Sequence, residues 1–321
     1  MPDVSRVSLC LLPTPLHRLD RLSDELGCDL WIKRDDLTGF AGGGNKGRKL
    51  EYWMGLARAM GATAVVSCGA SQSNFVRQLG AACSVMEMRC CVVSMDSPYE
   101  VLDRKVSGTL SQGGNVVLDR WFGIERRVLA DGTWDELEDC ADELGKELEA
   151  DGERVLRIPI GGSSVTSVHA FVEAGREVER EFDWVVSATS SGSTQIGLGY
   201  AFGEKGTKVL GVSADPDPEA FDDLLILNAA YASEFGVLPL LEAEIRFSLD
   251  YVGPGYGLAS DAGDAAAELM GRREGILLDP IYTAKAFAGL VDLAGRGEIG
   301  GRVLFWHTGG LPGLFARSEM S

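Results

Sequence analysis

The sequence predicts an α/β fold built on parallel sheets. Short apolar runs rich in β-branched residues recur along the 321-residue chain, and each is followed by a small-residue loop and then by a helical pattern. Strands of this continuous apolar kind are typical of parallel sheets covered by helices on both faces. In such folds ligands bind beyond the carboxyl ends of the strands, so function is expected in the loops that follow the strands.

The expected strands occupy residues 64–67, 90–94, 115–118, 184–187, 208–212 and 302–306. Helices are expected to begin near Val76 and after the loop at residues 188–194. The most polar segment, residues 131–154, is expected to form an exposed amphipathic helix whose charges face solvent. A chain of this length typically forms about two domains.

Composition excludes several classes of partner. A formal net charge of -18 argues against nucleic acid or an anionic membrane, because both require a basic surface. No apolar run reaches the roughly 18 residues that cross a membrane, and the N-terminus lacks the pattern of a signal peptide. The seven cysteines contain no C-x-x-C pair, which favours reduced thiols and a cytoplasmic location. The histidines show no ligand spacing with the cysteines, so no metal site is expected.

The first unusual loop is the glycine run that ends in Asn45 and Lys46, within FAGGGNKGRKLEY at residues 40–52. It matches a nucleotide-binding P-loop only in the spacing of Gly42 and Gly47, because the lysine and hydroxyl residue of that motif are missing. Glycines suit the close approach of a flat ring to the backbone, and a neutral lysine amine can form a Schiff base with an aldehyde. The alternative is a glycine turn that carries a solvated lysine.

The second loop, CGASQSNF at residues 68–75, joins a strand end to a helix start. Ser73 and Asn74 are good N-cap residues, and the first amides of the helix can bind an anion such as a substrate carboxylate. Simple capping, worth about 1 kcal/mol, is the alternative.

The third loop, TSSGST, begins at Thr189 and again lies between a strand and a helix. It offers hydroxyl groups and a glycine at the helix start: Ser190, Ser191, Gly192, Ser193 and Thr194. Such a loop can hold a phosphate without any positive side chain, although it can also serve as a linker. An aldehyde for the lysine and a phosphate for this loop are the two reactive ends of pyridoxal phosphate. The helix start at Ser73 would then hold an amino-acid substrate.

At these motifs the chain resembles the fold-type II pyridoxal-phosphate enzymes, and within them the family of D-cysteine desulfhydrase and 1-aminocyclopropane-1-carboxylate deaminase. The resemblance extends over nearly the whole chain through PTPLHRL, WIKRDDLTGF, GGNKGRKLE, GASQSNFVRQ, IPIGGSS, SGSTQIGL, GPGYGLASD, ILLDPIYTAKAFAGL and HTGGLPGLFA. It implies a tryptophan synthase β-like fold with two open parallel-sheet α/β domains, a large one of residues 1–49 and 160–321 and a small one of residues 50–159. It also implies that the cofactor lies in the cleft between them and that the chain forms a homodimer.

The resemblance assigns roles to single residues. Lys46 is implied as the Schiff-base lysine and as the base that moves the Cα proton, and the preceding Asn45 as a cofactor neighbour. Asn74 is implied to hold the phenolic oxygen of the cofactor, while Ser73, Asn74 and Phe75 bind the substrate carboxylate. The phosphate is implied to lie against residues 190–194. Tyr282 is implied to stack on the cofactor ring, and Tyr256 to lie near the substrate; a packed core aromatic is the alternative for each.

Two positions distinguish members of this family. In the deaminases an acidic residue follows the stacking tyrosine and pairs with the pyridine nitrogen, whereas here Thr283 follows, as in the desulfhydrases. HTGG with Thr308 is also the desulfhydrase form. A hydroxyl does not keep the ring nitrogen protonated as a carboxylate does, so the ring is a weaker electron sink. That suffices to expel a good β-leaving group, and the sequence therefore favours α,β-elimination from D-cysteine, giving pyruvate, ammonia and sulfide.

Other interpretations stay open. The phosphate loop with GSTQ looks more like the deaminase form, which keeps 1-aminocyclopropane-1-carboxylate deaminase as the main alternative. Phe75 stands where the desulfhydrases have histidine and the deaminases glutamine. Because apolar contacts discriminate weakly between substrates, a specialised relative such as a cysteate lyase or a β-replacement enzyme is a further alternative. A catalytically silent protein that binds pyridoxal phosphate or an amino acid is the alternative outside the enzymes.

Overall fold

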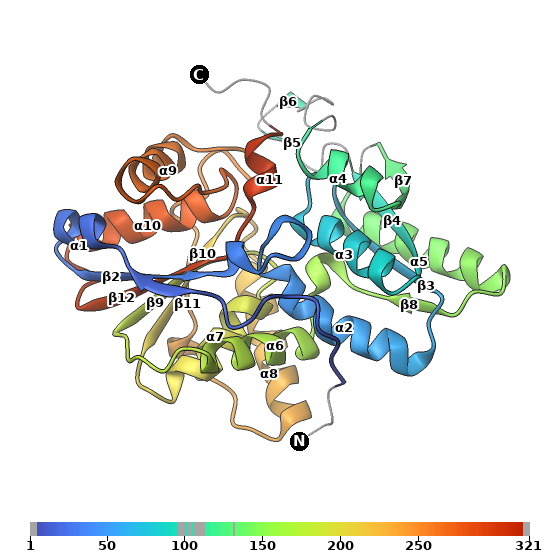
Figure 1. Cartoon of the computed structure of the whole chain (residues 1–321), viewed down its shortest axis with the longest axis horizontal. Coiled ribbons are helices and arrows are strands. Elements are labelled where there is room, and N and C mark those ends of the chain that lie inside the picture. Colours follow the sequence, from blue (N-terminus) through green and yellow to red (C-terminus); the bar gives the residue numbers. More distant parts are fainter. Residues whose placement is uncertain (1–4, 96–99, 102–103, 106–112, 131, 317–321) are drawn as a thin grey trace. The chain divides into compact units, whose positions relative to one another are not determined.

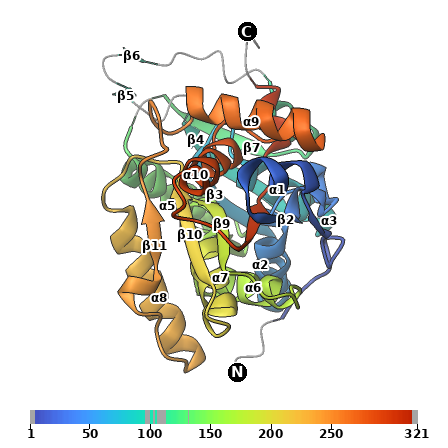
Figure 2. The same ribbon diagram turned by 90° about the vertical axis from the view of Figure 1, so that its left-hand side faces the viewer.

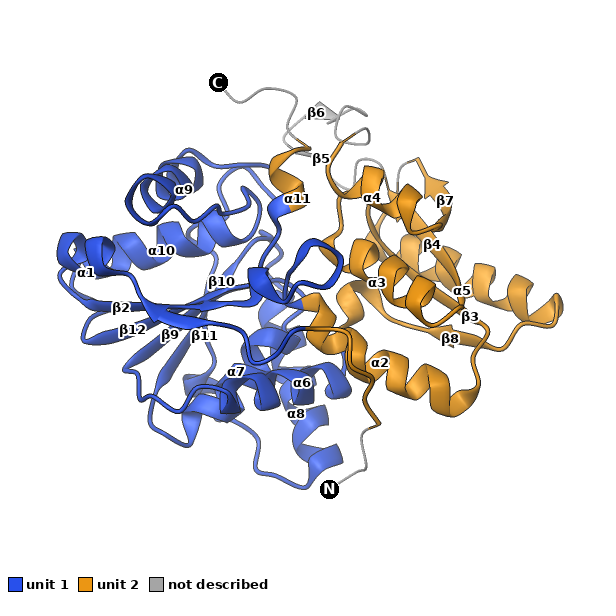
Figure 3. Ribbon diagram, in the orientation of Figure 1, with its two compact units in different colours: residues 1–2, 11–45, 164–311 blue, residues 3–10, 46–163, 312–321 orange. Residues whose placement is uncertain are grey.

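The computed structural model describes residues 5–95, 100–101, 104–105, 113–130 and 132–316 (Figure 1). The chain divides into two compact units (Figure 3). Unit 1 comprises residues 1–2, 11–45 and 164–311, and unit 2 comprises residues 3–10, 46–163 and 312–321. The long segments of the two units meet at residues 45/46 and 163/164. The domain limits expected from the sequence, at 49/50 and 159/160, stay a prediction. None of the described helices is both long enough and apolar enough to span a membrane.

Unit 1 contains a six-stranded sheet in the order β1-β2-β12-β9-β10-β11. Its strands are β1 Leu16–Arg18, β2 Asp29–Arg34, β9 Trp184–Thr189, β10 Lys208–Ser213, β11 Arg246–Ser248 and β12 Arg302–His307. All neighbours are parallel except β1 and β2, so the expected parallel architecture is confirmed. The predicted strands at 184–187, 208–212 and 302–306 are also confirmed.

Helices cover both faces of this sheet. They are α1 Asp20–Leu26, α6 Val165–Arg176, α7 Ser193–Gly203, α8 Ala220–Phe235, α9 Asp261–Glu274 and α10 Thr283–Gly295, with short 3-10 turns η1 Asp35–Leu37, η2 Phe40–Gly42 and η5 Glu242–Glu244. Figure 2 shows α1, α9 and α10 on one side of the sheet and α6 and α7 on the other. Successive residues of β9 pack against opposite helical layers. Val186 belongs to the same core cluster as Phe287 of α10, and Val185 to the same cluster as Phe171 of α6. This alternation explains why the strands are apolar throughout.

Unit 2 contains a four-stranded parallel sheet in the order β7-β4-β3-β8. Its strands are β3 Ala64–Ala70, β4 Arg89–Met95, β7 Glu125–Leu129 and β8 Val155–Arg157. Its helices are α2 Lys46–Met60, α3 Asn74–Val85, α4 Asn115–Trp121 and α5 Trp134–Ala150, with the 3-10 turn η4 Ile160–Gly162. Strands β5 Glu100–Val101 and β6 Arg104–Lys105 form a separate antiparallel pair, and α11 Leu311–Leu314 lies near the carboxyl end.

Two helices of unit 2 show how the sequence predicts local structure and where it misleads. The acidic segment forms α5 as expected, because Thr133 and Glu136 make a capping box and Leu137, Ala141 and Leu144 form its buried face. The strand predicted at residues 115–118 is wrong, since these residues begin α4. Four apolar residues do not distinguish the two structures, and the buried residues Asn115, Val116 and Asp119 follow helical spacing.

All seven cysteines lie in the described part of the chain and none forms a disulfide. Six are buried and Cys140 is partly exposed. Five of them lie in strands and helices of unit 2, which is consistent with the prediction of reduced thiols: Cys68, Cys83, Cys90, Cys91 and Cys140.

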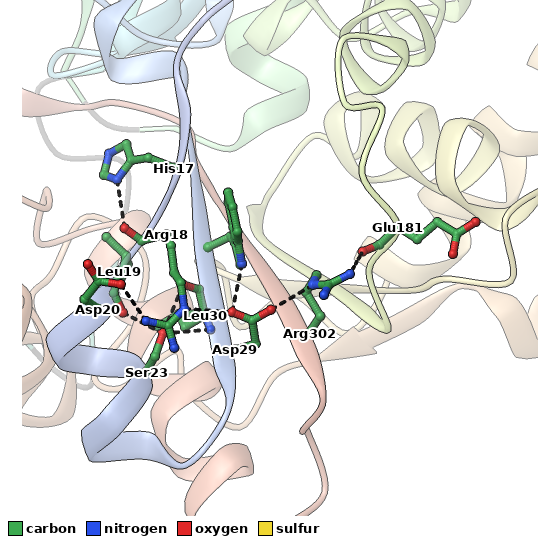
Figure 4. A network of polar contacts seen from close by, with 10 residues as sticks. His17, Arg18, Leu19, Asp20, Ser23, Asp29, Leu30, Glu181 and Arg302 are labelled. Atoms are coloured by element: carbon green, nitrogen blue, oxygen red, sulfur yellow. Dashed lines mark hydrogen bonds and ion pairs between the residues drawn. The ribbon is translucent and has the colours of Figure 1, made fainter.

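Asp29 fastens the amino ends of the parallel strands in unit 1 (Figure 4). Its carboxylate accepts hydrogen bonds from Arg302 Nε at 2.8 Å and from Arg18 Nε at 2.9 Å, both shown in Figure 4, and from Trp31 Nε1 at 3.0 Å. Arg302 also donates to the carbonyl of Glu181. Asp29, Arg18 and Arg302 line a surface hollow of about 760 Å³. The hollow lies at the strand ends opposite to the loops expected to carry function.

Asp29→Asn should lower the free energy of unfolding at pH 7 by about 1 kcal/mol, since the carboxylate is only partly buried. Hydrogen bonds from Arg302 and then Arg18 and Trp31 lower the pKa of Asp29 to about 2. The unfolded carboxyl has a pKa of about 3.9, so the stabilisation is present above that value and is lost as the pH falls toward 2. Urea unfolding at pH 7 and pH 3 should therefore show a smaller difference between the two proteins at pH 3. The exposed Asp24→Asn is the control, and an equal difference at both pH values would contradict the account.

Candidate active site

The glycine run before Lys46 has a backbone that only glycine accepts. Gly42, Gly43 and Gly44 have φ of 82°, 81° and 121°. A Cβ atom on Gly43 would lie 1.8 Å from the carbonyl oxygen of Asp36. The Gly44 amide donates to the Asp35 carbonyl oxygen at 2.9 Å. The run therefore packs on the turn that follows β2. This close packing requires glycine by itself, in addition to any approach of a ligand to the backbone.

Asn45 ties together three loops that follow strands of unit 1. Its backbone amide donates to the carbonyl of Thr308 at 2.9 Å, just beyond β12. Its side-chain Nδ2 donates to Thr194 Oγ1 at 3.1 Å, in the first turn of α7 after β9. Asn45 and Thr194 are buried. The structure thus brings Asn45, Thr194 and Thr308 together at the carboxyl ends of three strands, as the fold predicts.

The Ser190–Thr194 segment has two features that suit an anion. Helix α7 begins after Gly192, whose φ is 81°, and it has no side-chain cap. Ser193 Oγ is fully buried and makes no hydrogen bond within the described residues, and neither does Thr189 Oγ1. A buried hydroxyl without a partner costs about 1–3 kcal/mol, so an acceptor is needed there. The uncapped amino end of an 11-residue helix attracts negative charge, and a phosphate meets both requirements.

The two tyrosines of the predicted site lie together in unit 1. The hydroxyls of Tyr256 and Tyr282 are in hydrogen-bond contact, and the rings meet edge to face with centroids 5.9 Å apart. Burial raises the pKa of Tyr256 to about 12, so its hydroxyl stays protonated at neutral pH. Tyr256 can therefore act as a neutral hydroxyl donor at this pH.

Asp279 organises the start of α10, which carries Thr283. Its Oδ2 accepts from the amides of Ile281 and Tyr282, and its Oδ1 accepts from the amide of Thr283. The Thr283 hydroxyl donates to Asp279 Oδ1 at 2.6 Å and accepts from the Asp279 amide at 2.8 Å. Thr283 is fully buried, so its hydroxyl proton is committed to this carboxylate. Sequence reasoning missed Asp279, because it lies three residues before the N-cap Tyr282 and so outside the usual capping position.

Lys285 is a second feature that sequence reasoning missed in unit 1. Its side chain is fully buried, and Nζ donates to the carbonyl of Gly255 at 2.8 Å, directly before Tyr256. Burial lowers its pKa to about 8. A single lysine within a helical pattern gives no indication in the sequence that its side chain will be buried.

In unit 2, Lys46 begins α2 and lies beside Lys49. Burial lowers the pKa of Lys46 to about 8, and a hydrogen bond with Lys49 partly opposes this shift. Burial and the neighbouring Lys46 lower the pKa of Lys49 well below its usual value. Lys49 Nζ also donates to the Gly161 carbonyl at 3.2 Å. A neutral amine is a nucleophile, so the lowered pKa of Lys46 suits the role that the sequence predicts for it, and that role stays a prediction. The three-residue spacing of the two lysines on a helix was the available signal for Lys49.

The second loop has the predicted local structure. Ser73 is the N-cap of α3, and its side chain accepts from the amide of Val76 at 3.3 Å. Asn74 and Phe75 are the first two residues of the helix. Phe75 is 1% exposed, and its ring lies so close to Gly162 that a Cβ atom there would be 2.4 Å away. The aromatic side chain is thus a packing element, while the helix start remains free to supply amides.

Comparison with known proteins identifies the family. Residues 7–309 match the family model described as pyridoxal-phosphate dependent enzyme. The chain is 37% identical over 325 residues to a D-cysteine desulfhydrase of Klebsiella pneumoniae, covering 97% of this chain and 95% of the relative. It is 35% identical over 339 residues to a 1-aminocyclopropane-1-carboxylate deaminase of Burkholderia ambifaria, covering 98% and 97%.

A solved structure described as an ACC deaminase homologue superimposes with a TM-score of 0.87 at 36% identity, covering 98% of this chain and 94% of that one. A hydrogen sulfide-producing enzyme of Fusobacterium nucleatum, at 18% identity and a TM-score of 0.63, shares the fold over 92% and 93% of the two chains. The chain therefore belongs to the pyridoxal-phosphate dependent enzymes of fold type II, and within them to the lyases related to the desulfhydrases and deaminases. The predicted fold, enzyme class and cofactor are confirmed.

The residues present fit this cofactor. The uncapped start of α7 with the unpartnered Ser193 hydroxyl suits its phosphate, and the lowered pKa of Lys46 suits its aldehyde. The roles of the individual site residues stay predictions. The sequence-based site omits Lys49, Asp279 and Lys285, and it also omits Arg77 and Asn115, whose side chains both contact Asn74.

Acylation of Lys46 in the cofactor-free protein should follow the titration of an amine with a pKa of about 8. Since only the neutral amine reacts, the rate with acetic anhydride should rise with pH up to about 8 and then level off. Peptide mass spectrometry measures this rate, with the exposed Lys146 as internal reference. A Lys46 rate that keeps rising in parallel with that of Lys146 up to pH 10 would contradict the lowered pKa.

Gly192→Ala should weaken binding of pyridoxal phosphate by about tenfold, because a Cβ atom there strains a left-handed backbone at the helix start. The added atom would also lie 2.5 Å from Leu224 Cδ2. Gly203→Ala in the last turn of the same helix is the matched control, because its Cβ atom would meet nothing closer than 3.8 Å. Equilibrium binding to the cofactor-free proteins measures the effect, and equal affinities of the two variants would remove Gly192 from the phosphate site.

Proposed function

We propose that this protein is a lyase that carries out α,β-elimination on D-cysteine and gives pyruvate, ammonia and sulfide. The observation that carries this proposal is Thr283, which follows Tyr282 and is hydrogen-bonded through its hydroxyl to Asp279. A hydroxyl whose proton is committed elsewhere does not protonate a pyridine nitrogen. This environment supports expulsion of a good leaving group rather than chemistry that needs a stronger electron sink. The desulfhydrase relative of 37% identity supports the same reading.

Lys46 is proposed as the residue that binds the cofactor and moves the proton at the substrate Cα. Bound pyridoxal phosphate supplies an electron sink for the carbanion formed at that carbon. The lowered pKa of Lys46 supports proton transfer near neutral pH, because catalytic bases are most effective when their pKa lies near the working pH. The amine of Lys49 lies beside it: their hydrogen bond favours the charge on Lys46, while Lys46 disfavours a charge on Lys49, and burial remains the cause of the lowered pKa of Lys46.

The amino end of α3 is proposed to bind the substrate carboxylate. Ser73 already caps the helix, and the backbone amides of Asn74 and Phe75 follow it. Because the side chain of Phe75 is buried against Gly162, its contribution would come from the backbone alone. The Ser190–Thr194 segment is proposed to hold the phosphate. Asn45 supports it through Thr194, and the Thr308 carbonyl holds the Asn45 amide. Tyr256 and Tyr282 are proposed to lie at the substrate and cofactor ring.

A 1-aminocyclopropane-1-carboxylate deaminase is the second candidate, supported by the deaminase relative of 35% identity. The acidic residue of the deaminases has a counterpart nearby, because the Thr283 hydroxyl donates to the carboxylate of Asp279. That carboxylate accepts four hydrogen bonds in all. Release of 2-oxobutyrate from the cyclopropane substrate distinguishes this candidate. A requirement for an added nucleophile would indicate β-replacement instead.

Purified protein with bound cofactor should release sulfide and pyruvate in equal amounts from D-cysteine. Lys46→Ala should lower this rate by about a thousandfold, because proton transfer and cofactor attachment are both lost. Lys146→Ala on the exposed face of α5 should leave it unchanged. Sulfide and pyruvate are measured together for all three proteins. Near wild-type turnover by Lys46→Ala would refute the role of Lys46, and absence of both products from the wild-type protein would refute D-cysteine as the substrate.

We also propose that the chain works as a homodimer in the cytoplasm on a small amino-acid substrate. The family resemblance supports the dimer, and cysteines that form no disulfide suit a reducing compartment. Sedimentation of the protein with bound cofactor tests the dimer, which requires about twice the chain mass of 34.3 kDa.

A further inference from the structure

Two residues of unit 2 hold the side chain of Asn74. Arg77 lies on the next turn of the same helix, and Asn115 begins α4. Its Oδ1 accepts from Arg77 Nη1 at 2.9 Å and from Asn115 Nδ2 at 3.1 Å. Arg77 Nη1 also donates to Asn115 Oδ1 at 2.5 Å. Arg77 and Asn115 are fully buried. The three side chains therefore form a closed set of hydrogen bonds at the start of α3.

This set leaves only one orientation for each amide. An arginine can donate but never accept, so both asparagines must turn their oxygen atoms toward Arg77. Asn115 Nδ2 is then free to donate, and it does so to Asn74 and to the carbonyl of Gln72 at 2.7 Å. Gln72 is fixed as well, because its Oε1 accepts from the Asn115 amide at 2.9 Å and its Nε2 donates to Gly113. Arg77 Nη1, Asn115 Nδ2 and Gln72 Nε2 thus each donate to an acceptor within this set.

The consequence falls on the nitrogen of Asn74. Its Nδ2 has no acceptor within the described residues, and the side chain is partly exposed. Asn74 can therefore present only N–H groups to a ligand, and the ligand atom that faces it must be an acceptor. Burial lowers the pKa of Arg77 to about 10, so the guanidinium keeps its positive charge at neutral pH and favours a negative acceptor. The nearby carboxyl of Asp119 in α4 also favours the charge on Arg77, and it is itself in contact with Arg126.

We propose that Arg77 and Asn115 are positioning residues that fix the Asn74 amide with its N–H groups toward the phenolic oxygen of pyridoxal phosphate and so favour the anionic form of that oxygen. This inference rests on the proposed function, in which Asn74 contacts the cofactor. A reversed amide would place an oxygen against that oxygen and repel it. Binding of the cofactor thus depends on two residues that do not touch it.

The test compares two ligands on the cofactor-free protein: pyridoxal phosphate and its 3-deoxy analogue, which lacks the phenolic oxygen. The wild-type protein should prefer pyridoxal phosphate. Arg77→Met, which keeps the volume but removes the donors, should lower the ratio of the two affinities by about tenfold. Arg77→Lys should largely restore the ratio because lysine also only donates, whereas Arg77→Gln should not, since its amide can turn either way. Circular dichroism and urea unfolding check that each variant is folded.

The Asn74→Ala background separates positioning from general structural damage. There Arg77→Met should have no further effect on the affinity ratio, because the group that it orients is gone. Asn115→Ala provides a second variant should Arg77→Met fail to fold, and it should also lower the ratio. An unchanged ratio in folded Arg77→Met or Asn115→Ala, or an equal loss in the Asn74→Ala background, would overturn this inference alone. A wild-type protein that binds pyridoxal phosphate no better than the analogue would overturn the role of Asn74 in the proposed function and the inference with it.

Discussion

The hydrogen bonds around Gly44 and Asn45 are the constraint on which the rest of the site depends. The Gly44 amide is held by the Asp35 carbonyl, and the Asn45 amide is held by the Thr308 carbonyl. The Asn45 side chain adds a bond to Thr194. Three loops that follow parallel strands are thereby fixed by two consecutive residues, and Lys46 begins α2 immediately afterwards. Left-handed glycines make this possible because the backbones of Gly309 and Gly44 approach too closely for any Cβ atom.

The polar groups at the two ends of the six-stranded sheet differ in how completely they are hydrogen-bonded. At the amino ends of the strands, Asp29, Arg18 and Arg302 satisfy one another and hold the strands in register. At the carboxyl ends the polar groups are left incomplete, as the buried Ser193 hydroxyl shows. Incomplete hydrogen bonding costs stability, and it persists where a ligand completes it. The contrast is a physical reason to look for chemistry at one end only.

Sequence patterns predicted the features that depend on neighbouring residues. The apolar strands, the N-cap at Ser73 and the acidic helix α5 follow from local composition and spacing. The error at residues 115–118 and the omission of Arg77 have one cause. Asn115 belongs to a helix because its amide bonds to residues 72 and 74, more than 40 positions away. Such distant contacts leave no periodic signal in a single sequence.

The central claim is that Lys46 is the amine that carries the cofactor, although Lys49 and Lys285 are also buried amines with lowered pKa values. Borohydride reduction of the protein with bound pyridoxal phosphate, followed by peptide mass spectrometry, fixes the cofactor to whichever lysine holds it. The account predicts a single modified residue, Lys46. Modification of Lys49 or Lys285 in its place would contradict the account.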